Sequence, residues 1–585
     1  MDKSVSHVAP AIVRKSAGRT AADAIVETLV AAGVDTFFGV PGGPVMPLFD
    51  AVVRHPGARL VESRHESTAI FSAMGYWVQT GRVPGVLVTA GPGGTNAVTG
   101  VAAAHFENVP LIVLCGDVVW AATGRIHLQD MGPDGVGIET VMRHITRAAL
   151  RLPTGSAAVG YAGHAVTVAT NRERPGPVLL VVPRDRASAP ASTTELVVAS
   201  RPAQVLSSAS LQTITDVARR LAGARRPLVV VGSGCHQAAA EVQGMVEALR
   251  VPFVTTPRAK GIVGESHELS LRTGGMAASW WARRYVDEGV DVALVLGTDL
   301  DDVSVGPTPY VEPDGELIHV DLNPMVFGRS FETCMGVVAD VRSFAADLAS
   351  VSKRNHISSF EATTLVAQAK LSSPFDTPAF STDSAFPIAP HRAVYDLEQA
   401  AGPDARFVTD IGEHMLFALH YLTARDRNSF GIHLGLGSMA SGIGSAIGRA
   451  FADPSSLVVC ICGDGCMQMA GSELLVAVEH QLPVLVAVFN DGRYNMVYHG
   501  YKQEFGRQEP WAAPFSDFSV WASSMGIPSR IIERPGQITP ELIKDLMVTG
   551  GPALLDIRHD PSVRIKGAGR VEALQQMSHG GGQPC

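Results

Sequence analysis

Two acidic residues near the C-terminus, Asp464 and Asp491, each follow an apolar stretch of the kind that forms a buried strand. The stretches are Leu457 to Cys462 and Leu482 to Phe489. Adjacent strand ends would bring the two carboxylates together. Hard cations such as Mg²⁺ bind such oxygens at about 2.0–2.1 Å and usually share them with substrate phosphates. The sequence therefore predicts a metal-held diphosphate at this place.

Glycines flank Asp464 on both sides, and helix-like sequence follows. Glycine lets backbone N–H groups approach a phosphate, and a helix predicted to begin near Gly471 adds the partial positive charge of its N-terminus. A Gly-Asp-Gly tripeptide alone also occurs in ordinary loops. The spacing to Asn490-Asp491 therefore carries the prediction.

A third candidate, Glu66, lies at the start of the helix-like run Ser67 to Gln79, directly after the strand-like segment Arg59 to Ser63. Taken alone, it has two equally good explanations. It is either a solvated acid that the helix dipole favours in the first turn, or a catalytic carboxyl group.

Together these segments resemble the thiamine diphosphate enzymes of the acetolactate synthase, pyruvate decarboxylase and pyruvate oxidase superfamily. The superfamily fingerprint ends in Asn-Asn, where this chain has Asn490-Asp491. Three further segments resemble glycine-rich turns of the same superfamily, namely Phe38 to Gly43, Ala90 to Asn96 and Gly435 to Met439. The resemblance covers nearly the whole chain, and among the members the acetolactate synthases fit best.

The resemblance implies a role for each candidate. Glu66 hydrogen-bonds N1′ of the aminopyrimidine ring, and Gln129 lies near the reacting centre. Asp464, Asp491 and the main-chain carbonyl of Arg493 bind Mg²⁺. The other implied contacts of thiamine diphosphate are with Gly412, Glu413, His414, Gly437, Met439, Gly463, Gly465, Cys466, Tyr494, Asn495 and Met496. For a methionine such as Met439, a place in the core is the more common alternative.

Several positions depart from the acetolactate synthase pattern. Asp299 stands where the biosynthetic synthases have an arginine that anchors the acceptor carboxylate, and Gly500 stands where they have a tryptophan. Glu413 replaces a glutamine that contacts the diphosphate, and a carboxylate cannot donate a hydrogen bond. Lys502 or Arg507 could take over anion binding, although a solvated charge explains either residue as well. The donor half of the site thus resembles the family, and the acceptor half differs.

Composition excludes several classes of protein. With 585 residues, 46% of them hydrophobic and 18% charged, the chain can form two to four domains with large cores. A net charge of -9 argues against nucleic acid or an anionic membrane as a partner. No apolar run approaches the roughly 20 residues of a membrane span. The seven cysteines form no disulfide framework or Cys-x-x-Cys motif, which fits a cytoplasmic protein, and Met1 to Arg19 is interpreted as a short polar tail.

The predicted fold class is α/β, with three doubly wound parallel-sheet domains. Apolar strand candidates alternate with helical patterns throughout the chain. The expected domains are residues 1–186, which bind the pyrimidine, 201–349, a central α/β domain, and 385–570, which bind thiamine diphosphate and Mg²⁺. Ala187 to Ser200 and Ser350 to Ser384 are expected to connect them. No internal repeat is visible in the sequence.

The function that the resemblance implies is that of an acetolactate synthase-like carboligase. Such an enzyme decarboxylates a small 2-oxo acid donor, here expected to be pyruvate, and transfers the acyl unit to a carbonyl acceptor. A homodimer or homotetramer with active sites at the dimer interface is implied as well. A decarboxylase or oxidase of the same superfamily is the alternative, and a non-catalytic scaffold is disfavoured because Glu66, Asp464 and Asp491 occur together. The resemblance leaves open whether the central domain binds FAD.

Overall fold

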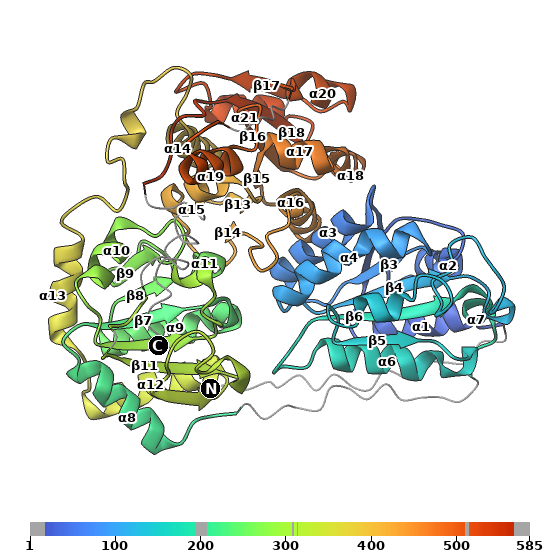
Figure 1. Cartoon of the computed structure of the whole chain (residues 1–585), viewed down its shortest axis with the longest axis horizontal. Coiled ribbons are helices and arrows are strands. Elements are labelled where there is room, and N and C mark those ends of the chain that lie inside the picture. The colour runs from blue at the N-terminus through green and yellow to red at the C-terminus, as the bar shows by residue number, and fades with distance from the viewer. Residues whose placement is uncertain (1–17, 193–206, 307–308, 313, 509–513, 567–585) are drawn as a thin grey trace. The chain divides into compact units, whose positions relative to one another are not determined.

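The computed structural model describes residues 18–192, 207–306, 309–312, 314–508 and 514–566 (Figure 1). Within these residues the strands form three six-stranded sheets, and neighbouring strands pair in parallel throughout. Helices connect the strands. The predicted α/β class with three parallel-sheet domains is therefore confirmed.

The first sheet is built from the N-terminal part of the chain. Its strand order is β2 (Arg59–Glu62), β1 (Thr36–Gly39), β3 (Gly85–Val88), β4 (Leu111–Asp117), β6 (Pro177–Pro183) and β5 (Ala148–Arg151). Its helices are α1 (Ala21–Ala31), α2 (Met46–Arg54), α3 (Glu66–Thr80), α4 (Pro92–Phe106), α5 (Ile138–Met142), α6 (Ala158–Ala169) and α7 (Arg184–Ser188). Every residue of β3, β4 and β6 is buried, which explains their uninterrupted apolar sequence.

The second sheet follows in the middle of the chain. Its order is β12 (Met335–Val338), β11 (Glu316–Asp321), β10 (Val292–Leu296), β7 (Pro227–Val231), β8 (Phe253–Thr255) and β9 (Ser270–Thr273). Its helices are α8 (Leu211–Gly223), α9 (Ala239–Leu249), α10 (Trp280–Asp287), α11 (Asp302–Val305) and α12 (Val341–Asn355).

The third sheet carries the acidic turns. Its order is β14 (Phe430–Gly431), β13 (Arg406–Thr409), β15 (Val458–Gly463), β16 (Val484–Asn490), β18 (Ala553–Arg558) and β17 (Ser529–Ile532). The helices in this part of the chain are α14 (Pro390–Ala401), α15 (Glu413–Tyr421), α16 (Ser441–Ala452), α17 (Asp464–Ala470), α18 (Leu474–Glu479), α19 (Asn495–Phe505), α20 (Phe518–Ser524) and α21 (Pro540–Leu546).

The first and third sheets have the same topology, although the sequence shows no repeat. Numbered from its own first strand, each has the order 2-1-3-4-6-5, whereas the second sheet has the order 6-5-4-1-2-3. In an open parallel sheet, ligands bind at the carboxyl ends of the strands where the winding direction reverses. In the third sheet that switch point lies between β13 and β15. The predicted metal ligand Asp464 directly follows β15.

The connections differ in part from the sequence prediction. Ser350 to Ser384 contains a regular helix, α13 (Phe360–Ala369), because Ala362 and Val366 on one face are buried. Ala187, the first residue of the other expected connection, is buried within α7. Residues 193–200 of that connection lie outside the described residues, as do 1–17 of the expected tail and 567–570 of the third expected domain. The prediction that a helix begins near Gly471 was wrong. Helix α17 already starts at Asp464, and a short 3-10 turn, η7 (Gly471–Glu473), follows it.

By its internal contacts the chain divides into two compact units. Unit 1 comprises Met1–Gln204, Gly435–Ser455 and Met469–Leu482, and unit 2 comprises Val205–Leu434, Ser456–Gln468 and Pro483–Cys585. Helix α16 therefore belongs with the first sheet, where it packs on α3. A Cβ added at Gly448 would lie 1.8 Å from the carbonyl oxygen of Ser72, and one added at Gly75 would lie 2.2 Å from that of Ser445. Only glycine permits the two helices to approach this closely.

No helix among the described residues has both the length and the apolar character of a membrane span.

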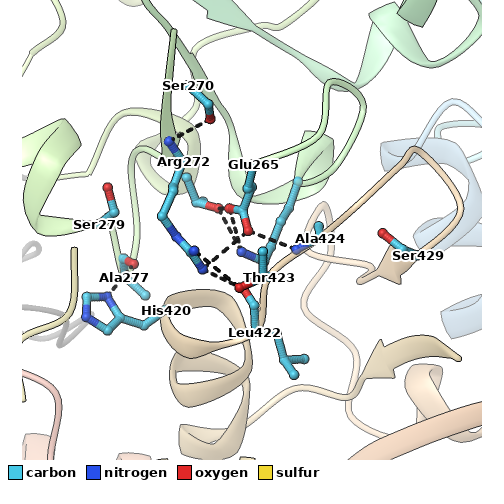
Figure 2. Close-up of polar contacts among 12 residues, drawn as sticks. Glu265, Ser270, Arg272, Ala277, Ser279, His420, Leu422, Thr423, Ala424 and Ser429 are labelled. Atoms are coloured by element: carbon cyan, nitrogen blue, oxygen red, sulfur yellow. Dashed lines mark hydrogen bonds and ion pairs between the residues drawn. The ribbon is translucent and has the colours of Figure 1, made fainter. Parts of the chain in front are cut away.

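Unit 2 contains a buried network of charged side chains beside the second sheet (Figure 2). Lys260 Nζ donates to Glu265 Oε1 at 2.6 Å, and both side chains are fully buried. Glu265 Oε2 also accepts the backbone N–H of Ala424 at 2.9 Å, and Arg272 donates to the carbonyl of Leu422 at 2.8 Å. The network thus holds the segment after α15 against the central part of the chain. Burial lowers the pKa of Lys260 to about 8.

We expect Glu265→Ala to destabilise the protein strongly, because it leaves Lys260 and Arg272 buried without their carboxylate. Removing one partner of a buried ion pair costs about 3–5 kcal/mol. Urea unfolding measures the loss, and Glu268→Ala, at an exposed glutamate of the same loop, serves as the matched control. Equal unfolding midpoints for the two variants would show that the network contributes nothing to stability.

Candidate active site

Glu66 is the first residue of α3, and its buried side chain is hydrogen-bonded to Asn96. His65, just before it, caps the helix by accepting the N–H of Ser67 on Nδ1 at 3.2 Å. Glu66 is only 7% exposed. Its Oε2 accepts the side-chain amide of Asn96 at 3.0 Å. The structure therefore contradicts the solvated-acid interpretation, and Asn96 fixes one carboxyl oxygen while the other is left for a different donor.

Gln129 lies on a loop that Arg151 holds in place by hydrogen bonds. Its own φ is +65°, and a Cβ added at Gly91 would lie 2.6 Å from its Cγ, so the side chain packs on the glycine turn before α4. Arg151 contacts Asp117 at the end of β4 and donates to the carbonyl of Met131 at 3.2 Å. Asp117 in turn accepts the N–H of Met131 at 3.1 Å. Gln129 and Glu66 both belong to unit 1.

Asp464 and Asp491 come together in unit 2, at the ends of β15 and β16. The backbone N–H of Arg493 donates to Asp464 Oδ2 at 3.1 Å and to Asp491 Oδ1 at 3.2 Å. Burial raises the pKa of both groups, that of Asp491 to about 7 with a further contribution from the charge of Asp464. Asp464 also accepts the N–H of Gly465, but two buried carboxylates this close together would be ionised at low cost only with a cation between them.

Asn490 is anchored through its side-chain nitrogen, and its Oδ1 is buried without a hydrogen-bond partner among the described residues. Its side-chain amide donates to Asp556 Oδ1 at 2.8 Å and to the carbonyl of Ser516 at 2.9 Å. Sequence reasoning missed His559, whose Nε2 lies 3.8 Å from Asp491 Oδ2. It follows β18 directly, so a search for polar residues after every apolar strand could have found it.

The imidazole of His414 lies against the glycines of the switch point. Cβ atoms added at Gly412 and Gly463 would lie 2.6 and 3.0 Å from ring atoms of His414. Burial lowers the pKa of His414 to about 3, so the ring is neutral, and its Nε2 is buried without a hydrogen-bond partner. Such an orphaned polar atom needs a polar ligand group.

Glu413 is held in a network around the carbonyl of Pro561. It accepts the side-chain amide of Asn495, and His499 Nε2 lies 3.7 Å from it. Asn495 and His499 both reach the carbonyl oxygen of Pro561 at 3.1 Å. Burial raises the pKa of Glu413 to about 8, with a contribution from the charge of Asp491. A protonated Glu413 could donate a hydrogen bond, which removes the difficulty that the replacement of glutamine posed.

The other predicted residues occupy varied environments. Cys466 is buried and its Sγ lies 3.2 Å from the carbonyl oxygen of Ile411, while the N–H of Gly465 donates to Asp464 Oδ1 at 2.6 Å. Tyr494 is 43% exposed, and Met496 packs against the core of the third sheet. Gly437, with φ +68°, and the partly buried Met439 lie in unit 1.

The residues of unit 2 fit Mg²⁺ and a diphosphate. Asp464 and Asp491 supply hard oxygen ligands, and their negative charges lie unfavourably close together unless a cation binds them. His414 offers a buried nitrogen without a hydrogen-bond partner in the described part of the chain. The described residues contain no group of three or more His, Cys, Asp or Glu side chains able to hold a metal. A metal here therefore needs ligands besides the two carboxylates, such as a carbonyl oxygen and phosphate oxygens.

The switch point of the second sheet, between β7 and β10, fits a flavin diphosphate poorly. Asp299 follows β10 and Asp321 ends β11, and burial together with Asp299 raises the pKa of Asp321 to about 6. Arg258 is already paired with Asp299 at 3.1 Å and with Asp301 at 2.7 Å. This acidic surrounding repels an anionic cofactor.

Family comparison agrees with the fold. Models of the thiamine pyrophosphate enzyme N-terminal TPP binding domain, central domain and C-terminal TPP binding domain match residues 19–138, 214–348 and 410–557. The chain belongs to the thiamine pyrophosphate enzyme family. Glu66 falls in the first matched region, and Asp464 and Asp491 fall in the third.

Individual relatives with similar sequences are named as acetolactate synthases or their large subunits. The chain is 29% identical to an acetolactate synthase of Mycobacterium bovis, over 82% of this chain and 77% of the relative. It is 29% identical to a probable acetolactate synthase large subunit of Methanocaldococcus jannaschii, over 96% and 94%. It is 27% identical to the acetolactate synthase isozyme 1 large subunit of Escherichia coli, over 93% and 95%.

We expect Asp491→Asn to stabilise the metal-free protein at high pH. The native carboxyl group binds its proton more tightly than in the unfolded chain, so the wild-type protein loses stability as the pH rises from about 4 through 7. One pKa unit corresponds to about 1.4 kcal/mol, so we expect a gain of ~1–3 kcal/mol at pH 8 and almost none at pH 4.5. Urea unfolding in EDTA measures it, with the exposed Asp545→Asn as control. A gain that does not depend on pH would refute the explanation.

Proposed function

We propose that the protein is a thiamine diphosphate-dependent carboligase that decarboxylates a small 2-oxo acid, most simply pyruvate, and transfers the acyl unit to a carbonyl acceptor. The observation that carries this proposal is the meeting of Asp464 and Asp491 at one N–H beside the switch point of the third sheet. The similarity to acetolactate synthases supports the type of reaction.

Each candidate site residue then has a proposed role. Asp464, Asp491 and the carbonyl of Arg493 would hold Mg²⁺, and His414 Nε2 would be available to the diphosphate. Glu66 would hydrogen-bond N1′ of the aminopyrimidine with one oxygen, while Asn96 holds the other. Bound thiamine diphosphate supplies the carbanion chemistry that releases carbon dioxide. Gln129, packed on the glycine turn, orients the reacting groups.

The acceptor side is proposed to differ from that of the biosynthetic synthases. Asp299 stands in the place of their acceptor-binding arginine and is paired with Arg258, which Asp301 also contacts. Two carboxylates and one guanidinium leave a net negative charge. Gly500 on α19 is buried and provides none of the bulk of a tryptophan. A neutral or larger acceptor fits these features better than 2-oxobutyrate.

The direct test supplies the purified protein with thiamine diphosphate, Mg²⁺ and pyruvate, and identifies the products. Acetolactate or another carboligation product supports the proposal. Free acetaldehyde identifies a decarboxylase, and acetate formed with an electron acceptor identifies an oxidase. Failure to retain thiamine diphosphate or to consume any 2-oxo acid would refute the enzyme assignment.

We expect Glu66→Gln to leave cofactor binding nearly unchanged but to slow deprotonation at C2 by at least ~10²-fold, the usual contribution of acid–base assistance. Hydrogen–deuterium exchange at C2 of the bound cofactor measures the rate. Glu62→Gln, at an exposed position four residues earlier, is the control. Exchange at the wild-type rate in Glu66→Gln would remove Glu66 from the mechanism.

We also propose that each active site forms between subunits of a homodimer or homotetramer. Glu66→Gln and Asp464→Ala should each be inactive. Subunit exchange between the two variants should restore part of the activity, because a mixed interface can combine one intact Glu66 with one intact Asp464. Heterodimers that form and show no activity would contradict this arrangement.

We expect 2-oxobutyrate to be a poor acceptor. A charge-assisted hydrogen bond to a carboxylate contributes about 1.5–3 kcal/mol, so its loss reduces selection by roughly tenfold or more. Competition between pyruvate, 2-oxobutyrate and neutral aldehydes or ketones, with pyruvate as donor, measures the preference. Preferential formation of acetohydroxybutyrate would show that the acceptor side works as in branched-chain amino-acid synthesis.

A further inference from the structure

Unit 1 buries a carboxylate for which the proposed reaction has no use. Glu473 ends the 3-10 turn η7 and is only 1% exposed. The backbone N–H of Arg64 donates to both of its oxygens, at 3.2 Å to Oε1 and 3.1 Å to Oε2. Residues more than 400 positions apart in the chain are therefore joined beside Glu66.

The hydrogen bonds to Glu473 come from backbone N–H groups, and the side chain of Ser63 and the charge of Arg64 also favour its ionised form. The guanidinium of Arg64 instead bonds the carbonyl of Glu62 at 2.9 Å and the carboxylate of Glu479 at 2.9 Å. Burial raises the pKa of Glu473 to about 7, while the N–H groups of Arg64 and His65 oppose the shift. A buried carboxylate is costly, and a pure packing role could be filled by an apolar side chain.

The backbone that Glu473 fixes is the turn from which Glu66 projects. Arg64 and His65 lie between the end of β2 and the first residue of α3. The body of α3 is already fixed by the close packing of α16 at Gly75 and Gly448. The start of the helix is the part that still needs a constraint, and Glu473 provides it from Met469–Leu482, a different segment of unit 1 from the one that contains α16.

We propose that Glu473 is a positioning residue for the catalytic carboxyl group of Glu66, which it holds in place through the backbone N–H of Arg64. This inference rests on the proposed function for its catalytic part. Its structural part, the fixing of the turn between β2 and α3, stands independently.

The test compares Glu473→Gln with Glu479→Gln, which removes the exposed ion pair of Arg64 and leaves the buried contact. In cofactor-free protein, mass spectrometry should show amide exchange in the peptide around residues 63–67 faster by about tenfold in Glu473→Gln, and nearly unchanged in Glu479→Gln. Only the former removes the charged acceptor of the backbone N–H of Arg64. With thiamine diphosphate and Mg²⁺ bound, C2 exchange should fall by about tenfold, while cofactor affinity changes by less than about threefold.

Unchanged amide exchange in a folded Glu473→Gln protein would overturn the positioning role. So would C2 exchange at the wild-type rate despite a loosened turn. If Glu473→Gln does not fold, Glu473→Asp, which keeps the charge but shortens the reach, carries the same comparison. A wild-type protein that does not accelerate C2 exchange would instead refute the proposed function, and the amide-exchange result would still decide the structural part.

Discussion

The burial of two carboxylates, Asp464 and Asp491, that meet at one shared backbone N–H is the constraint on which the rest of the site depends. Neither group can be ionised at low cost in this position, as the raised pKa of each shows. The parallel pairing of β15 with β16 imposes the proximity, because it aligns the strand ends. A site of this kind is stable in its charged form only with a cation. The fold therefore holds this carboxylate pair at a cost in its own stability, which a bound cation would offset.

Around this constraint the chain places groups that are neutral or only partly satisfied. His414 is neutral and keeps an unpartnered nitrogen, and the raised pKa of Glu413 favours its protonated form. Both follow β13, across the switch point from Asp464. Low charge and available polar atoms at the end of a parallel sheet suit the binding of an anionic group through a metal. The exchange of glutamine for Glu413 is compatible with this environment.

Hydrogen bonds between buried charged side chains and the backbone fix other segments of the chain. Buried ionic groups make contact with backbone atoms as well as with one another. Glu265 and Arg272 bind the backbone at Ala424 and Leu422, and Glu473 binds the backbone at Arg64. Hydrogen bonds of this type specify where a main chain lies, which apolar packing alone does less strictly. These contacts thereby fix the turn before α3 and the segment after α15 to parts of the chain that are distant in sequence.

The sequence by itself determined the α/β class, the family, and the apolar strands with Asp464 and Asp491 at their ends, because these follow from local patterns of a few residues. It could not show that the first and third sheets share one topology, since winding order leaves no periodic signal. Nor could it show that Asn490 turns toward Asp556, that His559 lies beside Asp491, or that Asn96 and Glu473 secure Glu66 and its turn. Those contacts join residues that are far apart in the chain, and only the tertiary structure, through strand order and close helix packing, decided which of them meet.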